Sequence, residues 1–424
     1  MHEVSDSLNS SARVTGLLPV LAVNKDEDIR IREAALEVFS KRGYPERNDE
    51  EYKYSPAGKI FSTFTSSETG VSPVVADLPS GIRISFSGSA IIISGDVRLP
   101  QGFIVCTLQD ALEQKHPAAI RYLNKLFGQP EDSLLALNIS EALTGLFIYA
   151  PVKCILPEVL HIIYPESSAE NTLLNLRNLF VFSDQSECNI SEYWLCSSKQ
   201  NQGLTWSSEI VLEGSARLNI YKNQFAENGA VLFDHTHAQV LGKGVLKTAT
   251  LSHGGKWIRN NLTIELLSSH AEVHLNGLFS TSDKQHVDHH TAVIHAEPHC
   301  NSFQLYKGVL QQQSSGVFNG KILVRRDAQK TNAYQSSQNL VLGNHASINA
   351  KPQLEIFADD VKCSHGSSTG KIDHDALFYL RCRGLSEESA KRLLIDAFSS
   401  QVLDTIEDDA IKAFASGRIF SDSI

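Results

Sequence analysis

The feature that most constrains the fold is a long succession of short β-like runs from about Leu146 to Ile356. Ser, Asn, Gly, Asp and His separate the runs, several later ones recur at a regular spacing of about ten residues, and no helical pattern intervenes. Examples are Leu218–Tyr221, Val231–Phe233, Leu262–Leu266, Val273–Leu275, Val293–His295 and Lys321–Val324. Such a pattern is typical of either a β-sandwich or a solenoid.

Short polar segments between the runs favour the solenoid. Leu275–Leu278, Gly316–Gly320 and Leu342–Ala346 resemble the corners of a stacked coil, where Gly or Asn adopts positive φ. We therefore predict a mainly β protein with a parallel β-helix core over residues 146–370. A mixed, mostly helical region precedes it (1–145) and a helical region follows it (371–424).

The flanking regions show helical periodicity. Glu27–Lys41 predicts one helix, and Asp110–Phe127 predicts another that Pro117 interrupts. Asn138–Leu143 is briefly helical, whereas Ile82–Val97 alternates with period two and predicts short strands.

The C-terminal tail predicts a group of helices. A first helix after Asp373 ends at Gly384, Ser386 begins a second, and Ile406–Phe414 predicts a third. Their amphipathic faces could serve internal packing or a partner.

Composition narrows the functional classes. The net charge of -10, with Lys and Arg scattered along the chain, disfavours nucleic-acid binding. No apolar stretch approaches the roughly 20 residues that span a bilayer, so we expect no membrane segment. Met1–Ser11 is polar and lacks a secretory signal pattern, and seven widely spaced cysteines indicate thiols in a reducing compartment. We expect a cytoplasmic protein.

The densest polar cluster runs from Asp283 to Cys300 and includes five histidines. On a strand, His289 and His295 would share one face about 20 Å apart, too far to hold one metal. The cluster also lacks a His-Glu-x-x-His pattern. Structural imidazoles are the favoured interpretation, but a metal role for His286, His289 and His290 stays open, and a cupin-like protein would use His289, His290 and His295.

A second candidate site is the pair Cys363 and His365. At i and i+2 on a strand, both side chains leave the same face and can address one ligand. A thiolate and an imidazole suit iron, but two ligands make no closed site, so another chain would have to complete the coordination. Spacing alone favours a structural cysteine beside a surface histidine. The chain has no phosphate-binding Gly-rich loop, no nucleophile elbow and no Cys-x-x-Cys.

Several segments together carry a family resemblance. From Gln285 to Phe398 the chain resembles the SufB/SufD family in order and spacing, and Gly43–Tyr54 resembles an N-terminal family segment with Tyr52 in place of the usual Trp. The middle third is only loosely similar. The matching segments are Gln285–Thr291, Tyr306–Leu310, Gly316–Ile322, Ala328–Thr331, Asn339–Gly343, Pro352–Ile356, Ala358–Gly366 and Leu377–Gly384.

The resemblance implies a right-handed parallel β-helix that pairs with a SufB-like subunit and carries a SufC-like ATPase on its C-terminal helices. It implies no catalysis by this chain and no tightly bound cofactor, only iron or a nascent cluster held transiently with SufB. It leaves open whether the isolated chain forms a homodimer. The expected ATPase-docking residues are Leu377, Phe378, Leu380, Arg383, Leu393, Leu394 and Phe398.

Two positions separate the branches of the family. SufB-like chains carry a sulfur-accepting cysteine just before the segment matching Asn339–Gly343, and this chain has Gln335–Asn339 there. The Cys363-x-His365 pair resembles the SufD pattern, which makes both residues candidate ligands of iron or a nascent cluster. The alternatives are a β-helical carbohydrate-active enzyme, which would need clustered Asp or Lys/Arg on one exposed sheet of the solenoid, and a His-rich metal-binding protein.

Overall fold

The computed structural model describes residues 25–420, apart from positions 56, 68–69, 74, 76, 96–97, 143, 168 and 198–200; of residues 25–28 it describes the backbone alone. The N-terminal segment on which the expected lack of a secretory signal rests lies outside this part. So do Val97 and Leu143, at the ends of two segments predicted above.

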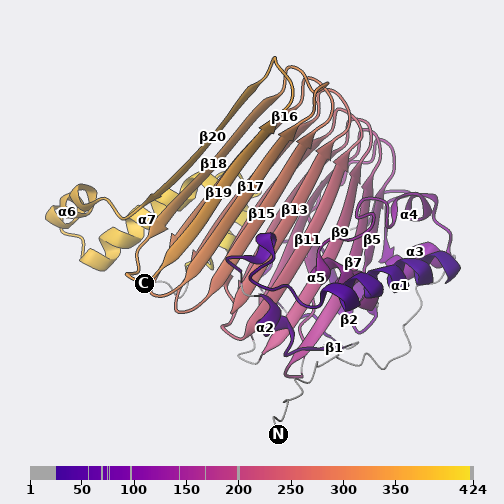
Figure 1. Ribbon diagram of the computed structural model, residues 1–424, viewed down its shortest axis with the longest axis horizontal. Coiled ribbons are helices and arrows are strands. Elements are labelled where there is room, and N and C mark those ends of the chain that lie inside the picture. Colours follow the sequence, from indigo (N-terminus) through magenta and orange to yellow (C-terminus); the bar gives the residue numbers. More distant parts are fainter. Residues whose placement is uncertain are drawn as a thin grey trace, which may run out of the picture.

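The core is a β-solenoid in which successive strands alternate between two parallel sheets (Figure 1). Each strand pairs with the strand two places on, after one complete turn; Thr172, for example, pairs with Gln202. Sheet A contains β5 (Leu146–Ala150), β7 (Thr172–Phe182), β9 (Gln202–Leu212), β11 (Ala230–Val240), β13 (Trp257–Leu266), β15 (His286–His295), β17 (Ser315–Val324) and β19 (Ser347–Ile356). Sheet B contains β6 (Leu160–Ile163), β8 (Glu187–Cys196), β10 (Arg217–Ala226), β12 (Val245–Gly254), β14 (Glu272–Thr281), β16 (Asn301–Leu310), β18 (Asn332–Val341) and β20 (Lys362–Gly370). The predicted solenoid is confirmed; its right-handed winding stays a prediction from the resemblance.

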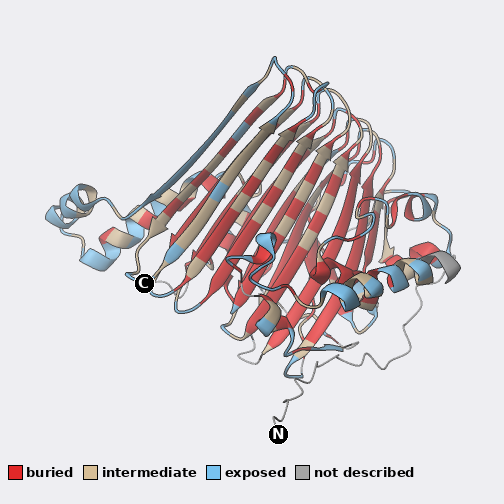
Figure 2. Ribbon diagram, viewed as in Figure 1, coloured by how far each residue is buried: buried red, intermediate tan, exposed pale blue. Residues whose placement is uncertain are grey.

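Side-chain alternation explains why the sequence winds this way. Inward residues of both sheets, such as Leu218 and Ile220 of β10 and Leu232 of β11, belong to one buried apolar cluster along the solenoid (Figure 2). The outer faces of many strands are covered as well, by the N-terminal and C-terminal segments. Apolar residues therefore also occur at outward positions, and the sequence does not alternate strictly between apolar and polar residues. The interior also holds charged groups that form ion pairs: the Lys222 ammonium lies 2.6 Å from the Asp234 carboxylate.

Short antiparallel strands and helices close the N-terminal end. β2 (Ile82–Ser87) and β4 (Ile104–Thr107) extend sheets B and A, and the hairpin strand β3 (Ala90–Ser94) pairs with β2. The helix α3 (Leu108–Glu113) is followed by α4 (Pro117–Tyr122), which begins at the interrupting proline because Pro117 fits the first helical turn.

The rest of the N-terminal region packs on the outer face of sheet A. It comprises α1 (Lys25–Arg42), η1 (Glu50–Tyr52), α2 (Ala57–Phe61) and α5 (Ser133–Glu141), whereas β1 (Thr65–Ser67) joins sheet A itself by pairing in parallel with β7. Phe61 meets Trp257 of β13 edge to face, with ring centroids 5.3 Å apart. Packing against the solenoid therefore fixes this region.

Three helices follow the solenoid in the described residues, and the last two of them pack against sheet B. They are α6 (His374–Cys382), α7 (Glu387–Leu403), which the Ser386 hydroxyl caps, and α8 (Asp409–Ser416). The Tyr193 and Phe414 rings, on β8 and α8, are 5.2 Å apart. The third helix starts three residues later than predicted because Asp408 caps it, whereas α6 stands off the solenoid (Figure 1).

The C-terminal end of the solenoid is open. β19 and β20 are the last strands of their sheets, and each pairs on one side only. Most residues of β20 are exposed, because no further turn of the described chain covers them. Within the described residues, no helix is long and apolar enough to cross a membrane.

Candidate functional site

Cys363 and His365 lie on β20 at this open end. Their register partners on β18 are Ala333 and Gln335, which point into the solenoid. Cys363 is half-buried in an apolar cluster with Ile322 and Ala333, and this burial raises the pKa of its thiol. His365, two residues on, is exposed. Both side chains therefore leave β20 on the inner face, at the mouth of the solenoid.

The described residues supply no third ligand at this place. Among them, no group of three or more His, Cys, Asp and Glu side chains could hold a metal ion. Iron, if it binds here as cargo, therefore needs donors from another chain. A thiol and an imidazole on the rim fit half of such a site.

A groove of about 500 Å³ lies beside the pair. Its lining includes Gln304, Gln335 and His365, together with Tyr334 of β18 and Gln401 of α7. The rings of His274, Phe303 and Tyr334 stack along sheet B toward this edge. The groove thus connects the open edge with the C-terminal helix.

The free edge of β20 carries unpaired backbone groups. The Lys362 N–H donates to the Thr331 carbonyl at 2.8 Å, so in this parallel pairing every second residue from Lys362 bonds to β18. The residues between them, at 363, 365, 367 and 369, direct their backbone groups to the open side. β20 can therefore accept another strand.

The neighbouring edge, β19, is blunted. The Ser347 N–H donates to the Ser314 carbonyl at 3.0 Å, so Ser347 and every second residue after it bond to β17. Pro352 consequently falls on the free side, where its missing N–H interrupts the row of donors in mid-strand. Of the two open strands, β20 is the better template for pairing.

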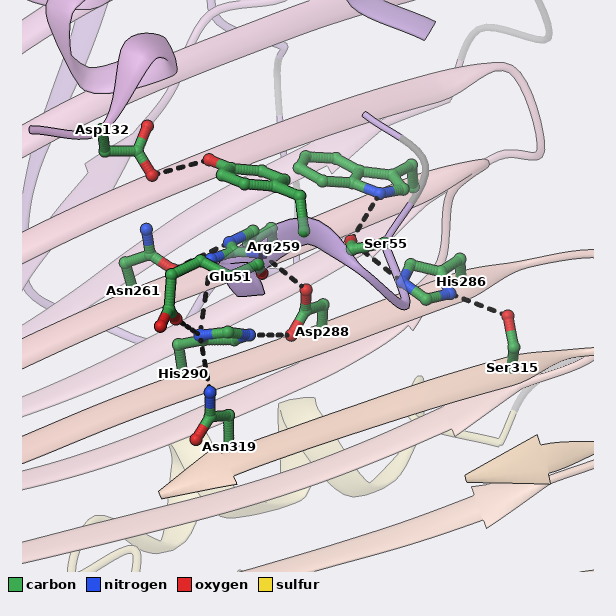
Figure 3. Close-up of polar contacts among 12 residues, drawn as sticks. Glu51, Ser55, Asp132, Arg259, Asn261, His286, Asp288, His290, Ser315 and Asn319 are labelled. Carbon is green, nitrogen blue, oxygen red and sulfur yellow. Dashed lines mark hydrogen bonds and ion pairs between the residues drawn. The ribbon is translucent and has the colours of Figure 1, made fainter. Parts of the chain in front are cut away.

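The histidine cluster on β15 divides between the two faces of sheet A. His286 and His290 point outward to the N-terminal region, and His289 points inward between Phe279 and Tyr306 (Figure 3 shows the outward pair). His286 holds two hydroxyls, with Nε2 3.1 Å from Ser55 Oγ and Nδ1 2.7 Å from Ser315 Oγ. The three histidines proposed as metal ligands therefore do not converge on one ion.

A charge network fixes the segment of residues 50–55, here called the strap, on sheet A (Figure 3). Arg259 donates to the Asp288 carboxylate at 3.0 Å and to the Glu51 carbonyl at 2.7 Å, and its guanidinium lies 4.0 Å from the centre of the Tyr52 ring. His290 bridges Asp288 and the Glu51 carboxylate at 3.0 and 3.1 Å.

The neighbouring charges determine the protonation states of Asp288 and His290 in this network. Burial opposes the ionised carboxylate of Asp288, but His290 and Arg259 outweigh it and hold its pKa well below the usual range. Burial and Arg259 lower the pKa of His290, but Asp288 and Glu51 outweigh them and raise it. The network therefore favours a cationic His290 between two carboxylates, which is the wrong state for a metal ligand.

The inward histidines are held neutral. Burial lowers the pKa of His289 to about 4, and burial lowers that of His295 to about 4 as well. His295 Nε2 lies 2.9 Å from the Ser302 hydroxyl. These imidazoles thus take part in the interior packing.

The predicted ATPase-docking residues occupy α6, the turn after it and α7. No residue of α6 is buried, and the side chains of Phe378 and Leu393 are 69% and 47% exposed. Phe398 instead anchors α7, because Lys307 donates to its carbonyl at 2.8 Å and lies over its ring. The others, Leu377, Leu380, Arg383 and Leu394, are exposed or half-buried.

Comparison with known proteins decides the family. Residues 165–398 match the model described as SUF system FeS cluster assembly, SufBD core domain, and residues 90–162 match the SufBD protein N-terminal region. The chain belongs to the SufBD family. The match covers the solenoid from β7 to β20 and continues into α7.

Two SufBD relatives match most of the chain, and a third matches about half of it. The iron-sulfur cluster assembly protein SufD of Escherichia coli is 28% identical over 394 residues, 91% of this chain and 90% of the relative. A SufBD family protein of Synechocystis is 27% identical over 424 residues, 94% of this chain and 91% of the relative. One from Mycobacterium leprae is 35% identical over 208 residues, covering 47% of this chain and 53% of the relative.

Proposed function

We propose that this chain is a SufD-like scaffold subunit of the SUF machinery. It pairs with a SufB-like subunit, binds a SufC-like ATPase and helps iron or a nascent cluster to assemble at the shared interface. The observation that carries the proposal is the half-site of Cys363 and His365 on an open solenoid edge, beside unpaired backbone groups.

The edge supports pairing through β20. A strand of the partner can continue the sheet there and bring its own ligands to the inward face of Cys363 and His365. A second copy of this chain offers the same edge, so a homodimer of the isolated protein follows from the same geometry.

The exposed apolar surface of α6 and α7 supports ATPase docking. The side chains of Phe378 and Leu393 are largely exposed, and α6 stands off the solenoid (Figure 1), so a partner can reach this surface without unfolding the core. On this proposal the chain itself has no catalytic activity, holds no resident cofactor and works in the cytoplasm, and ATP hydrolysis belongs to the partner.

The first experiment tests pairing at the edge. Coexpression with SufB-like and SufC-like chains, followed by size-exclusion chromatography with light scattering, should yield a three-component particle. Ser367→Pro removes a donor on the free side of β20 and leaves the bonds to β18, so it should abolish pairing with SufB. Ser367→Ala is the matched control and should assemble normally. Assembly of the proline variant would refute pairing through β20.

The second experiment tests the half-site. Replacing both Cys363 and His365 by Ala should reduce the cluster yield of the purified three-protein complex without changing its assembly. His270→Ala, at an exposed histidine on a solenoid corner, controls for the loss of a surface imidazole. An unchanged cluster yield in the double variant would remove the half-site from the proposal.

The third experiment tests ATPase docking. Phe378→Ala combined with Leu393→Ala should abolish copurification of the SufC-like ATPase and leave the SufB pairing intact. Ile120→Ala on α4 removes a side chain of similar exposure, 52%, from another region. Equal ATPase binding by all these proteins would place the docking surface elsewhere.

A further inference from the structure

A column of polar side chains lies in the interior directly below His365. In register, His365 of β20 pairs with Gln335 of β18, which pairs with Gln304 of β16. Partners in adjacent parallel strands point the same way at a spacing of about 4.8 Å. A glutamine amide is therefore the nearest inward neighbour of His365 along the solenoid.

The side-chain hydrogen bonds of this column end on the side-chain oxygen of Gln304. The Gln335 amide group donates from Nε2 to Gln304 Oε1 at 3.3 Å, and the Thr291 hydroxyl donates to the same oxygen at 2.8 Å. Within the part of the chain that the structure describes, Gln335 Oε1 has no hydrogen-bond partner, although Gln335 is only 3% exposed. An unpaired buried acceptor is costly, so such an atom calls for a ligand, a water or a moving donor.

The opposite sheet leaves room for this glutamine. A Cβ on Gly320 of β17 would lie 2.1 Å from Gln335 Nε2 and 2.7 Å from the Phe318 ring. Gly320 thus leaves the space into which the Gln335 side chain extends across the interior. Its amide is held between Gly320 and Gln304, with the free oxygen as the remaining polar atom.

We propose that Gln335 is a positioning residue for His365. Its free Oε1 accepts a hydrogen bond from one ring N–H of His365, which fixes the tautomer and directs the other ring nitrogen to the open edge. Residues that bond to the second ring nitrogen of a ligating histidine orient the ring and increase its basicity. The inference rests on the proposed function, because it assigns His365 as a donor to iron or a nascent cluster.

The first test uses the isolated full chain and needs no metal. Nitrogen-15 NMR of labelled histidine, with the His365 signals assigned by their loss in His365→Asn, reports the ring tautomer. The native protein should show one dominant tautomer, and Gln335→Leu should show a mixture.

Gln335→Glu keeps an acceptor and should preserve the single tautomer, and Gln338→Leu, on the outward face of the same strand, should change nothing. The same tautomer populations in native and Gln335→Leu protein would overturn the inference, since a water could then satisfy the glutamine.

The second test measures binding of Fe(II) alone to the complex with the SufB-like and SufC-like partners. Gln335→Leu should weaken binding by about 10- to 100-fold, in the range seen for residues behind metal ligands. Loss of Fe(II) binding in His365→Ala but not in Gln335→Leu would reject the positioning role alone. Unchanged binding in His365→Ala would reject the proposed half-site instead, while the tautomer measurement would still decide the role of Gln335.

Discussion

The strap on sheet A gives the sharpest prediction about local stability. Arg259→Met removes the charged hydrogen bond to the Glu51 carbonyl and the contact with the Tyr52 ring, but keeps an unbranched apolar side chain. The hydrogen bond contributes about 1.5–3 kcal/mol, and the cation–π contact contributes about 0.5–2 kcal/mol. Allowing for overlap, the free energy of opening the strap should fall by about 2–4 kcal/mol.

Hydrogen exchange can measure this opening directly. The amides of Tyr52, Lys53 and Ser55 are hydrogen-bonded within the strap region and report its local opening. At a factor of ten per 1.4 kcal/mol, their exchange in Arg259→Met should accelerate roughly 30- to 700-fold.

Lys351→Met is the matched control, because it breaks the exposed Lys351–Glu50 ion pair at the same strap. An exposed pair contributes at most about 1 kcal/mol, so exchange should accelerate by no more than about fivefold. Equal effects of the two variants, or no effect of Arg259→Met, would show that the buried network does not fix the strap.

Three further predictions concern the interior. Burial lowers the pKa of His295 to about 4 while the unfolded value stays near 6.5, so the unfolded state binds more protons and stability falls as the pH drops from about 6.5 toward 4. Between pH 7 and pH 5, denaturant titrations should show that the free energy of unfolding falls by about 2 kcal/mol less in His295→Gln than in the native protein. Equal decreases in the two proteins would contradict this prediction. Gly320→Ala collides with the Gln335 amide and should cost about 1–3 kcal/mol, with partial recovery when Gln335→Ala is added; purely additive costs would reject the clash. Lys222→Met leaves the Asp234 carboxylate buried without its cation and should cost about 3–5 kcal/mol, whereas a loss below 1 kcal/mol would mean that the pair is hydrated.

Much of the fold could be predicted because it depends on local signals. The strand runs from Leu146 to Ile356 form the solenoid, the helix predicted to begin at Ser386 is confirmed, and the predicted interruption at Pro117 is the start of α4. Two of the three predicted corners were wrong, because Leu275–Leu278 and Gly316–Gly320 lie inside β14 and β17; only Leu342–Ala346 is a turn between strands. The SufB/SufD resemblance and the i, i+2 spacing placed Cys363 and His365 on one strand, as the structure has them.

The contacts that fix the histidine cluster could not be predicted from local pattern. His290 meets Glu51 239 positions away, and Ser55 meets His286 231 positions away. Alternation correctly separated His289 from His290, but nothing in the run itself showed that an N-terminal segment covers the outer face. The sequence also could not show that Pro352 faces the free side of β19. That orientation depends on which backbone groups of β19 bond to β17.

The unequal ends of the solenoid limit how many chains can join. At one end, β3 and β4 are five and four residues long and run antiparallel to their neighbours, and the helices α3 and α4 follow β4. At the other, β20 offers a long row of free backbone groups. A chain with a single reactive end can recruit one neighbour and then has no site for the next, so growth stops at a pair. If chains pair through β20 as proposed, this asymmetry would stop growth at the pair, whereas a solenoid with two equivalent open ends could polymerise into fibres.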